Sequence, residues 1–274
     1  MLLNIRHETA YRYAVPASYS LQYMRLWPRA DGGQRVLNWR IDAPGRRWTQ
    51  QDAYGNAVFV TSLIDRHDEI RVVAQGQVET LDERGVLLPH DSAVPPLAFA
   101  LPTRLTEADA AIEELAASVL SGIAAAELAG PEPLQPLVDA VSARVSYVQG
   151  VTDVGHTAAE VLQLGQGVCQ DMAHVFLACC RVHGIPARYV SGYLLTDATH
   201  AASHAWAEVW LPAARGGAGA WVGFDVTHQR LAGPELCRLA VGRDYADASP
   251  MRGIHVGGAG EALAVHVAVQ GAEQ

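Results

Sequence analysis

Cys169, His204 and Asp225 are the residues whose types and order along the chain could support nucleophilic chemistry. A cysteine becomes an effective nucleophile when a histidine can accept its proton and a carboxylate orients that histidine. Cys169 stands where a loop punctuated by Gly165 and Gly167 enters an apolar helical pattern. Unpaired N–H groups and the positive end of the helix dipole at such a position favour a thiolate over a thiol. The three residues therefore predict a thiol-dependent enzyme.

The other three cysteines have surroundings that are typical of core residues. Cys179 and Cys180 fall in the middle of the same predicted helix, where apolar residues recur, and Cys237 lies in the segment PELCRLA. Free cysteine is among the residue types most often buried, so we expect all three to pack in the core. Four cysteines, two of them adjacent, also form a poor disulfide framework. The sequence therefore favours a reduced, cytoplasmic protein.

Local signals predict the helices around Cys169. A helix over residues 170–183 is followed by Gly184 and Pro186, a combination that stops helices. Thr157 and Glu160 have the spacing of a capping box and predict the start of a short helix that precedes the Cys169 loop.

The segments HAWAEVWLP and AWVGFDVT predict two strands downstream of Cys169. If they pair as a hairpin with Leu211 opposite Ala220, His204 and Asp225 meet at the same end of that hairpin, within a residue or two of register. A histidine–aspartate pair on a sheet, facing a cysteine at a helix start, is a papain-type arrangement. The predicted hairpin thus brings the candidate nucleophile, base and orienting acid together.

The rest of the chain predicts an α+β protein with two parts. Residues 1–95 contain strand-like runs separated by turn signals and predict an antiparallel β-domain, either a sandwich or a half-barrel. A proline-rich stretch up to residue 102 marks a boundary, after which Thr106 is predicted as the N-cap of a helix that ends near Gly122. We therefore expect a β-sandwich-like domain over residues 1–95 and a catalytic core over residues 96–274.

Composition excludes several classes of protein. The chain has 274 residues and a formal net charge of −9, which argues against binding to nucleic acid. No run of about 18 uninterrupted apolar residues occurs, and polar residues interrupt the amino-terminal segment, so neither a membrane span nor a signal peptide is predicted. All 20 basic residues are arginine, so the chain has no side-chain amine to offer as an acyl acceptor.

The segments GVCQDMAH, GIPARYVSGYL, SHAWAEVWLP and WVGFDVTH resemble, in this order, the motifs of the bacterial transglutaminase-like proteins. HETAYRYAVPASYSLQYMRLWPR resembles the amino-terminal β-domain of that family, and VGRDYADASPMRG resembles its carboxy-terminal segment. The resemblance implies a papain-like core in which Cys169 is the nucleophile, His204 is the base and then the acid, and Asp225 orients His204. This sequence departs from the family pattern at Met172, where Phe is common, and at Val226, where Pro often follows the Asp.

The resemblance implies acyl transfer through a thioester, without a cofactor. The substrate would be a protein, a peptide or an amide, and an amine or water would resolve the thioester. We expect the Cys169 backbone N–H in the oxyanion hole, with Gln170 or Tyr147 as candidates for the second donor. Trp206 is a candidate for shielding the site, and His228 is a candidate for lining the cleft.

Three alternatives stay open at this stage. Water as the acceptor would make the protein a cysteine peptidase or amidase. A binding or scaffold module that retains the fold would have no turnover. His200 and His204 have the spacing of a helical metal pair, but their flanking sequence predicts a loop entering a strand, so no metal site is expected. The sequence predicts neither the oligomeric state nor a calcium site.

Overall fold

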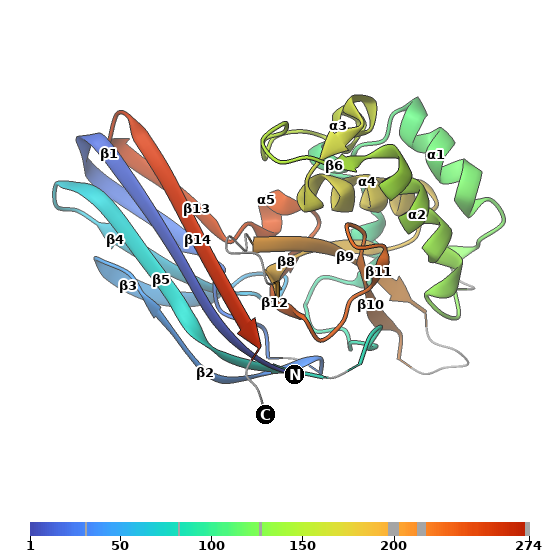
Figure 1. Cartoon of the computed structure of the whole chain (residues 1–274), viewed down its shortest axis with the longest axis horizontal. Helices are drawn as coiled ribbons and strands as arrows, with labels where there is room; N and C mark the ends of the chain where they lie inside the picture. The colour runs from blue at the N-terminus through green and yellow to red at the C-terminus, as the bar shows by residue number, and fades with distance from the viewer. Residues whose placement is uncertain (31, 82, 126–127, 197–202, 213–217, 272–274) are drawn as a thin grey trace.

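Residues 2–24 and 67–80 form long antiparallel strands because apolar and polar side chains alternate along much of their length, which buries one face of each. The structure is a computed structural model that describes residues 1–30, 32–81, 83–125, 128–196, 203–212 and 218–271. A curved β-sheet stands beside a core in which helices cover a second sheet (Figure 1). This arrangement confirms the predicted α+β class.

The β-domain is a single antiparallel sheet with the strand order β2-β5-β1-β4-β3, to which β13 and β14 add by pairing with β1. Its seven strands are β1 (Leu2–Met24), β2 (Gln34–Asp42), β3 (Arg46–Gln51), β4 (Ala57–Leu63), β5 (His67–Thr80), β13 (Met251–Gly257) and β14 (Glu261–Gly271). The long β1 pairs with β5 and β14 along its first half and with β4 and β13 along its second half. The sheet is therefore a half-barrel rather than a two-layered sandwich.

The carboxy-terminal strands belong to the amino-terminal sheet. β14 pairs with β1 from Leu3 opposite Gly271 to Tyr13 opposite Glu261, without a register shift. The predicted division placed residues 251–271 in the catalytic core, and it is wrong for that segment. Local patterns did not indicate this pairing, because the two strands that meet lie at opposite ends of the sequence.

The core sheet is antiparallel with the order β11-β10-β9-β8-β12. Its strands are β8 (Ala187–Leu194), β9 (Ser203–Leu211), β10 (Ala220–Asp225), β11 (Arg230–Leu231) and β12 (Leu236–Gly242). The core helices are α1 (Ala110–Leu120), α2 (Gln135–Arg144), α3 (Ala158–Leu164), α4 (Cys169–Val182) and α5 (Tyr245–Ala248), with β6 (Ser146–Tyr147) and β7 (Gln166–Gly167) forming a short parallel pair. In the described part of the chain no helix combines the length and the apolar character that a bilayer crossing requires.

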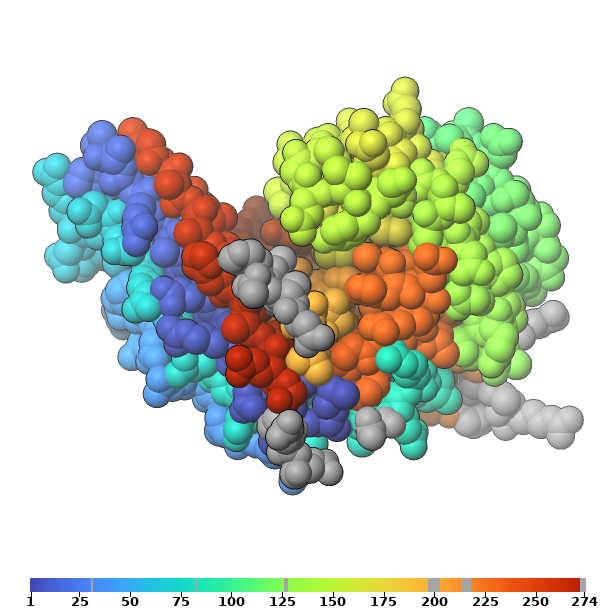
Figure 2. Space-filling view, in the orientation of Figure 1, coloured from blue at the N-terminus to red at the C-terminus, as the bar shows by residue number. Residues whose placement is uncertain are grey.

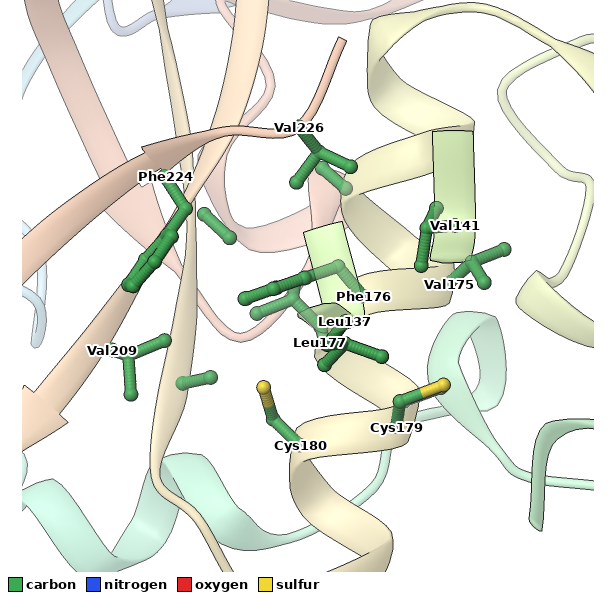
Figure 3. Packing of buried hydrophobic residues seen from close by; sticks show 14 of the residues in the cluster. Leu137, Val141, Val175, Phe176, Leu177, Cys179, Cys180, Val209, Phe224 and Val226 are labelled. Carbon is green, nitrogen blue, oxygen red and sulfur yellow. The ribbon is translucent and has the colours of Figure 1, made fainter. Parts of the chain in front are cut away.

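Helix α4 packs against β9 and is the centre of the core. Cys179 and Cys180 lie there with Phe176, Val209 and Phe224, and the two cysteines are fully buried (Figure 3). Their predicted packing role is confirmed.

Two of the three helix starts that the sequence indicated are close to the prediction. Thr157 and Glu160 form the predicted capping box of α3, and α4 begins one residue before the predicted start. The Thr106 prediction is wrong, because Asp109 caps α1 and accepts hydrogen bonds from the N–H groups of Ala111 and Ile112. The Thr106 hydroxyl instead accepts a hydrogen bond from the Thr103 N–H group in a short 3₁₀ turn.

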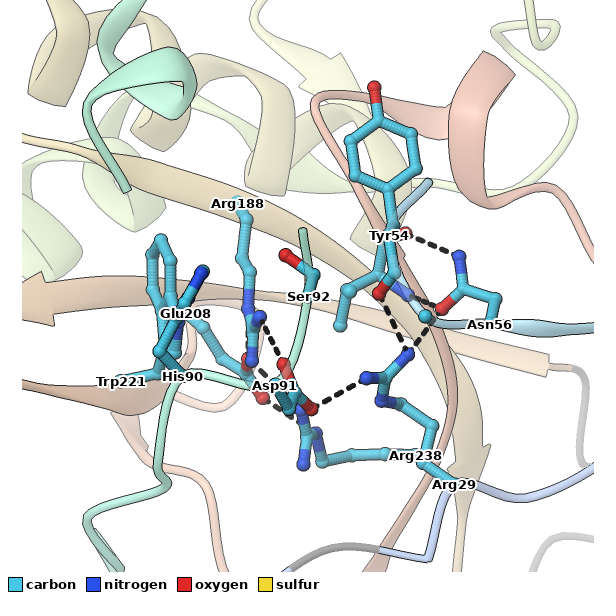
Figure 4. Close-up of polar contacts among 12 residues, drawn as sticks. Arg29, Tyr54, Asn56, His90, Asp91, Ser92, Arg188, Glu208, Trp221 and Arg238 are labelled. Carbon is cyan, nitrogen blue, oxygen red and sulfur yellow. Dashed lines mark hydrogen bonds and ion pairs between the residues drawn. The ribbon is translucent and has the colours of Figure 1, made fainter. Parts of the chain in front are cut away.

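A buried ionic network joins the β-domain, the linker and the core sheet (Figure 4). The Arg188 guanidinium, which is fully buried, contacts Glu208 at 2.7 Å and Asp91 at 3.0 Å. Arg238 binds the other oxygen of Glu208 at 2.7 Å, and Arg29 of the β-domain binds Asp91 at 2.5 Å. We call these five side chains the interface network.

Candidate active site

The start of α4 is held by a carboxylate. Oδ2 of Asp171 accepts hydrogen bonds from the Val168 N–H group at 2.8 Å and from the Thr152 hydroxyl at 2.6 Å. A Cβ atom at Gly167 would lie 2.7 Å from the same oxygen, so the loop needs glycine there. Asp171 thus has the helix-stabilising role that its position in the first turn suggests, and it fixes the backbone that presents Cys169.

Cys169 differs from the other cysteines in its exposure. It is half-buried, whereas Cys179, Cys180 and Cys237 have no exposed surface, and none of the four forms a disulfide. Burial raises the pKa of Cys179 to about 12 and that of Cys180 well above its ordinary value. Burial disfavours the thiolate, so these interior thiols are poor nucleophiles.

The predicted hairpin has the predicted register. Leu211 lies opposite Ala220, and β9 and β10 continue pairing as far as Ala207 opposite Phe224. His204 and Asp225 consequently meet at one end of the sheet, where Nε2 of His204 lies 3.0 Å from Oδ1 of Asp225. The hairpin is therefore the element that delivers both side chains.

His204 contacts both other members of the candidate triad. Burial alone would lower its pKa, but hydrogen bonds to Asp225 and Cys169 outweigh burial and raise the pKa to about 10. An imidazole that gains its proton in this environment is stabilised as the cation, as a base that deprotonates a thiol must be. The structure thus brings together all three residues that the sequence singled out.

The second carboxylate oxygen of Asp225 forms a hydrogen bond with a second histidine, His228. Nδ1 of His228 lies 2.7 Å from Oδ2 of Asp225, and the imidazole centroids of His204 and His228 are 5.3 Å apart. Asp225 is fully buried, which would raise its pKa, but the hydrogen bonds with both histidines hold the pKa well below its ordinary value. His228 was expected to line the cleft, and that role stays a prediction, while its Nδ1 lies on the second oxygen of Asp225.

The remaining candidates lie close to the triad. Trp206 is buried and stacks beside the His204 ring, with centroids 6.1 Å apart and an interplanar angle of 26°. Gln170 lies in the first turn of α4 and is nearly buried, whereas Tyr147 is 49% exposed on β6, which pairs with the strand before Cys169. The oxyanion roles of Gln170 and Tyr147 stay predictions.

One group of side chains has the composition of a metal site. Ligand atoms of His204, Asp225 and His228 lie within 4.8 Å of one another. Nε2 of His204 and Nδ1 of His228 already pair with the two Asp225 oxygens, so a metal ion bound through these atoms would have to displace both hydrogen bonds. His200, the other residue considered as a ligand, lies outside the described residues. The three residues therefore fit the orienting role at least as well as metal binding.

Sequence reasoning missed the aromatic residues behind Cys169. Tyr189 is buried in the core cluster against which Cys169 and Tyr245 pack, and the rings of Tyr189 and Tyr245 lie 6.3 Å apart. The Tyr245 N–H group donates to Nε2 of the buried His174, which gives that histidine a structural partner. Because α5 and β8 are far apart in the sequence, no local pattern could have placed these residues together.

Comparisons with known proteins agree with this architecture. Residues 114–226 match the transglutaminase-like superfamily core, and residues 3–79 match the bacterial transglutaminase-like N-terminal region. An uncharacterised protein of Mycobacterium tuberculosis is 33% identical over 91% of this chain and 86% of its own length. An uncharacterised protein of Mycobacterium leprae is 29% identical over 93% of each chain.

A solved structure shares the fold. It covers 100% of this chain and 91% of its own, with a TM-score of 0.77 and 21% sequence identity, and it is described as a suggested cysteine protease of Cytophaga hutchinsonii. At this identity the likeness shows a common fold.

Proposed function

Because the chain belongs to the transglutaminase-like superfamily, we propose that it is a cysteine enzyme that transfers an acyl group from a carboxamide or peptide bond to an amine or to water. The contact of His204 with both the half-buried Cys169 and the buried Asp225 carries this proposal. A scaffold that had lost turnover would not need an accessible thiol beside an imidazole that a carboxylate orients.

The first half-reaction consumes the donor. His204 takes the thiol proton, the Cys169 sulfur attacks the carbonyl carbon, and a tetrahedral oxyanion forms. When that intermediate collapses, the C–N bond breaks and the His204 imidazolium gives its proton to the departing amine or ammonia. An acyl-thioester on Cys169 and a neutral His204 remain.

The second half-reaction regenerates the thiol. An amine or a water molecule loses a proton to His204 and attacks the thioester carbonyl, after which the C–S bond breaks and the sulfur regains a proton from His204. We assign the Cys169 N–H group at the start of α4 as one oxyanion donor, with Gln170 or Tyr147 as candidates for the second. Asp225, with His228 on its other oxygen, keeps one tautomer and one orientation of His204.

The test is incubation with a library of glutamine-containing peptides, with and without a primary amine, followed by mass spectrometry. Amide-to-acid conversion, amine incorporation and backbone cleavage have different mass signatures, so one experiment separates hydrolase, transferase and peptidase. The enzyme itself has no lysine and therefore cannot supply the amine from its own side chains. We expect products with the wild type and with Cys179→Ala but none with Cys169→Ala.

An unmodified library would contradict the proposal when Cys169 is shown to be reduced and free. Equal alkylation rates at all four cysteines of the native protein would contradict it as well. The scaffold function would then be the better explanation of this fold.

A further inference from the structure

Strand β14 has a free edge. Within the described residues it pairs with β1 alone, so the backbone N–H and C=O groups along its other side have no strand partner. Free edges are ready templates for pairing with another chain, and natural proteins usually block them with charges, prolines or bulges.

Two other edges of the same sheet, at β2 and β3, are blocked in this way. β2 carries Arg35, Arg40 and Asp42 and has a register shift between residues 36 and 38, while β3 begins with two arginines. β14, with the sequence EALAVHVAVQG, has neither lysine nor proline, and Glu261 is its only acidic residue. The sheet thus protects the edges at β2 and β3, whereas β13, which carries Arg252, and β14 each pair with β1 alone among the strands that the structure describes.

The free edge of β14 also presents apolar side chains. Val267 and Val269 are buried against the core, in a cluster with Tyr193. Leu263 and Val265 lie on the same face of β14 by strand alternation, but they are 56% and 46% exposed. They extend the apolar stripe beyond the packed interface into solvent.

Strand β14 borders a notch beside the core. A notch separates the red strand β14 from the yellow-green residues around β6 and α3 (Figures 1 and 2). Tyr11 of β1 lies opposite Leu263, and on the other side of the notch Tyr147 lies opposite Gly167, two residues before Cys169.

The opposite side of the notch carries exposed apolar groups as well. Tyr147, Val151 and Val154 are 49%, 37% and 57% exposed in the segment between α2 and α3. A chain that lies between these residues and β14 would contact apolar side chains on both sides.

We propose that the edge of β14 binds the acyl-donor polypeptide as an added β-strand, with its apolar side chains against Leu263 and Val265. This inference rests on the proposed function, because the occupant is the donor that Cys169 would attack. Strand addition supplies main-chain hydrogen bonds irrespective of sequence, and alternate side chains supply the preference.

The test measures binding by the inert Cys169→Ala protein, so that it does not depend on turnover. The probe is a decapeptide in which Leu and Val alternate with Thr around a central Gln, compared with the same peptide bearing Ser for Leu and Val. Leu263→Ser with Val265→Ser removes the stripe, while Ala262→Ser with Ala264→Ser changes the other face of the same strand. We expect the stripe variant to bind the apolar peptide about tenfold more weakly or worse, and the control to bind normally.

Hydrogen exchange adds a readout for the backbone. Bound peptide should slow amide exchange in residues 261–266, and this protection should be lost in the stripe variant. Unchanged affinity in the stripe variant, absence of binding by both peptides, or protection elsewhere would overturn the proposal. A dimer in the ultracentrifuge that the stripe variant dissociates, with peptide affinity unchanged, would assign the edge to a second copy of the chain. Binding without turnover by the wild type would instead contradict the proposed function alone.

Discussion

The molecule contains two buried clusters of ionisable side chains on one sheet, and they differ in whether a proton can move. In the interface network, Arg188 keeps its charge between Glu208 and Asp91, because a guanidinium does not lose its proton in proteins. In the candidate active site, Asp225 faces His204, whose proton can pass to and from Cys169. Buried ionisable side chains therefore form fixed ion pairs in the interface network, whereas in the candidate active site they can exchange a proton.

Removal of the candidate nucleophile should have the largest effect. Cys169→Ala should lower kcat/KM by about a thousandfold or more, since loss of one member of a catalytic triad removes most of its effect. The free energy of unfolding should change little, because Cys169 is only half-buried. Peptide turnover and urea unfolding measure the two quantities. Cys179→Ala is the matched control, with activity retained and stability reduced, and equal loss of activity in both variants would contradict the assignment.

The interface network should show the opposite response. Arg188→Met leaves Glu208 and Asp91 buried without their shared partner, and removal of one partner of a buried pair costs about 3–5 kcal/mol of unfolding free energy. At temperatures where the variant is folded, kcat should be retained. Urea unfolding and peptide turnover again measure both quantities. Arg35→Met, which breaks an exposed pair with Glu79, should cost about 1 kcal/mol or less.

The difference between the clusters also reflects what a sequence reveals. Cys169 was identifiable because glycines and a helix start surround it, and His204 and Asp225 could be brought together by counting along one hairpin. These sequence patterns involve residues that are close together in the chain or are joined by a single hairpin.

The interface network depends on pairings that no local pattern encodes. Arg188 meets Glu208 through the β8–β9 register and meets Asp91 from the linker, while Arg29 arrives from the β-domain. The same holds for β14, whose addition to the amino-terminal sheet joins residues at opposite ends of the chain. Long-range pairing is chosen by the whole core, so a single sequence read locally does not specify it.

Alkaline pH should destabilise the candidate site without affecting the guanidinium network. The raised pKa of His204 contributes stability that is fully present below its unfolded value, about 6.5, and is lost as the pH rises through about 10. Cys169→Ala removes one of the hydrogen bonds that raise this pKa, so its stability should fall less between pH 6 and pH 10. Urea unfolding at both values tests the difference. An identical decrease in the wild type and in Cys169→Ala would mean that the contact between His204 and Cys169 does not hold the proton.

Acidic pH should act through Asp225. Its pKa is held down, so the stability that it contributes is present above the unfolded value of about 4 and is lost as the pH falls below it. Asp225→Asn removes the charge that both histidines contact, so the variant should lose less stability than the wild type between pH 5 and pH 3. Urea unfolding at these two values measures the loss, and an equal loss in both proteins would contradict the contribution of Asp225.

His228 should give the smallest effect and the finest comparison of the two clusters. It binds Oδ2 of Asp225, the oxygen that does not contact His204, and is partly exposed. It therefore positions the carboxylate without needing to touch the substrate. His228→Phe should lower kcat by about tenfold, in line with the loss of one hydrogen bond to a charged group, and leave KM nearly unchanged. His228→Asn retains a donor and should recover most of the rate. A role in stability alone would reduce the free energy of unfolding equally in both variants and would not make their kcat values differ. A role in substrate binding would raise KM in both variants.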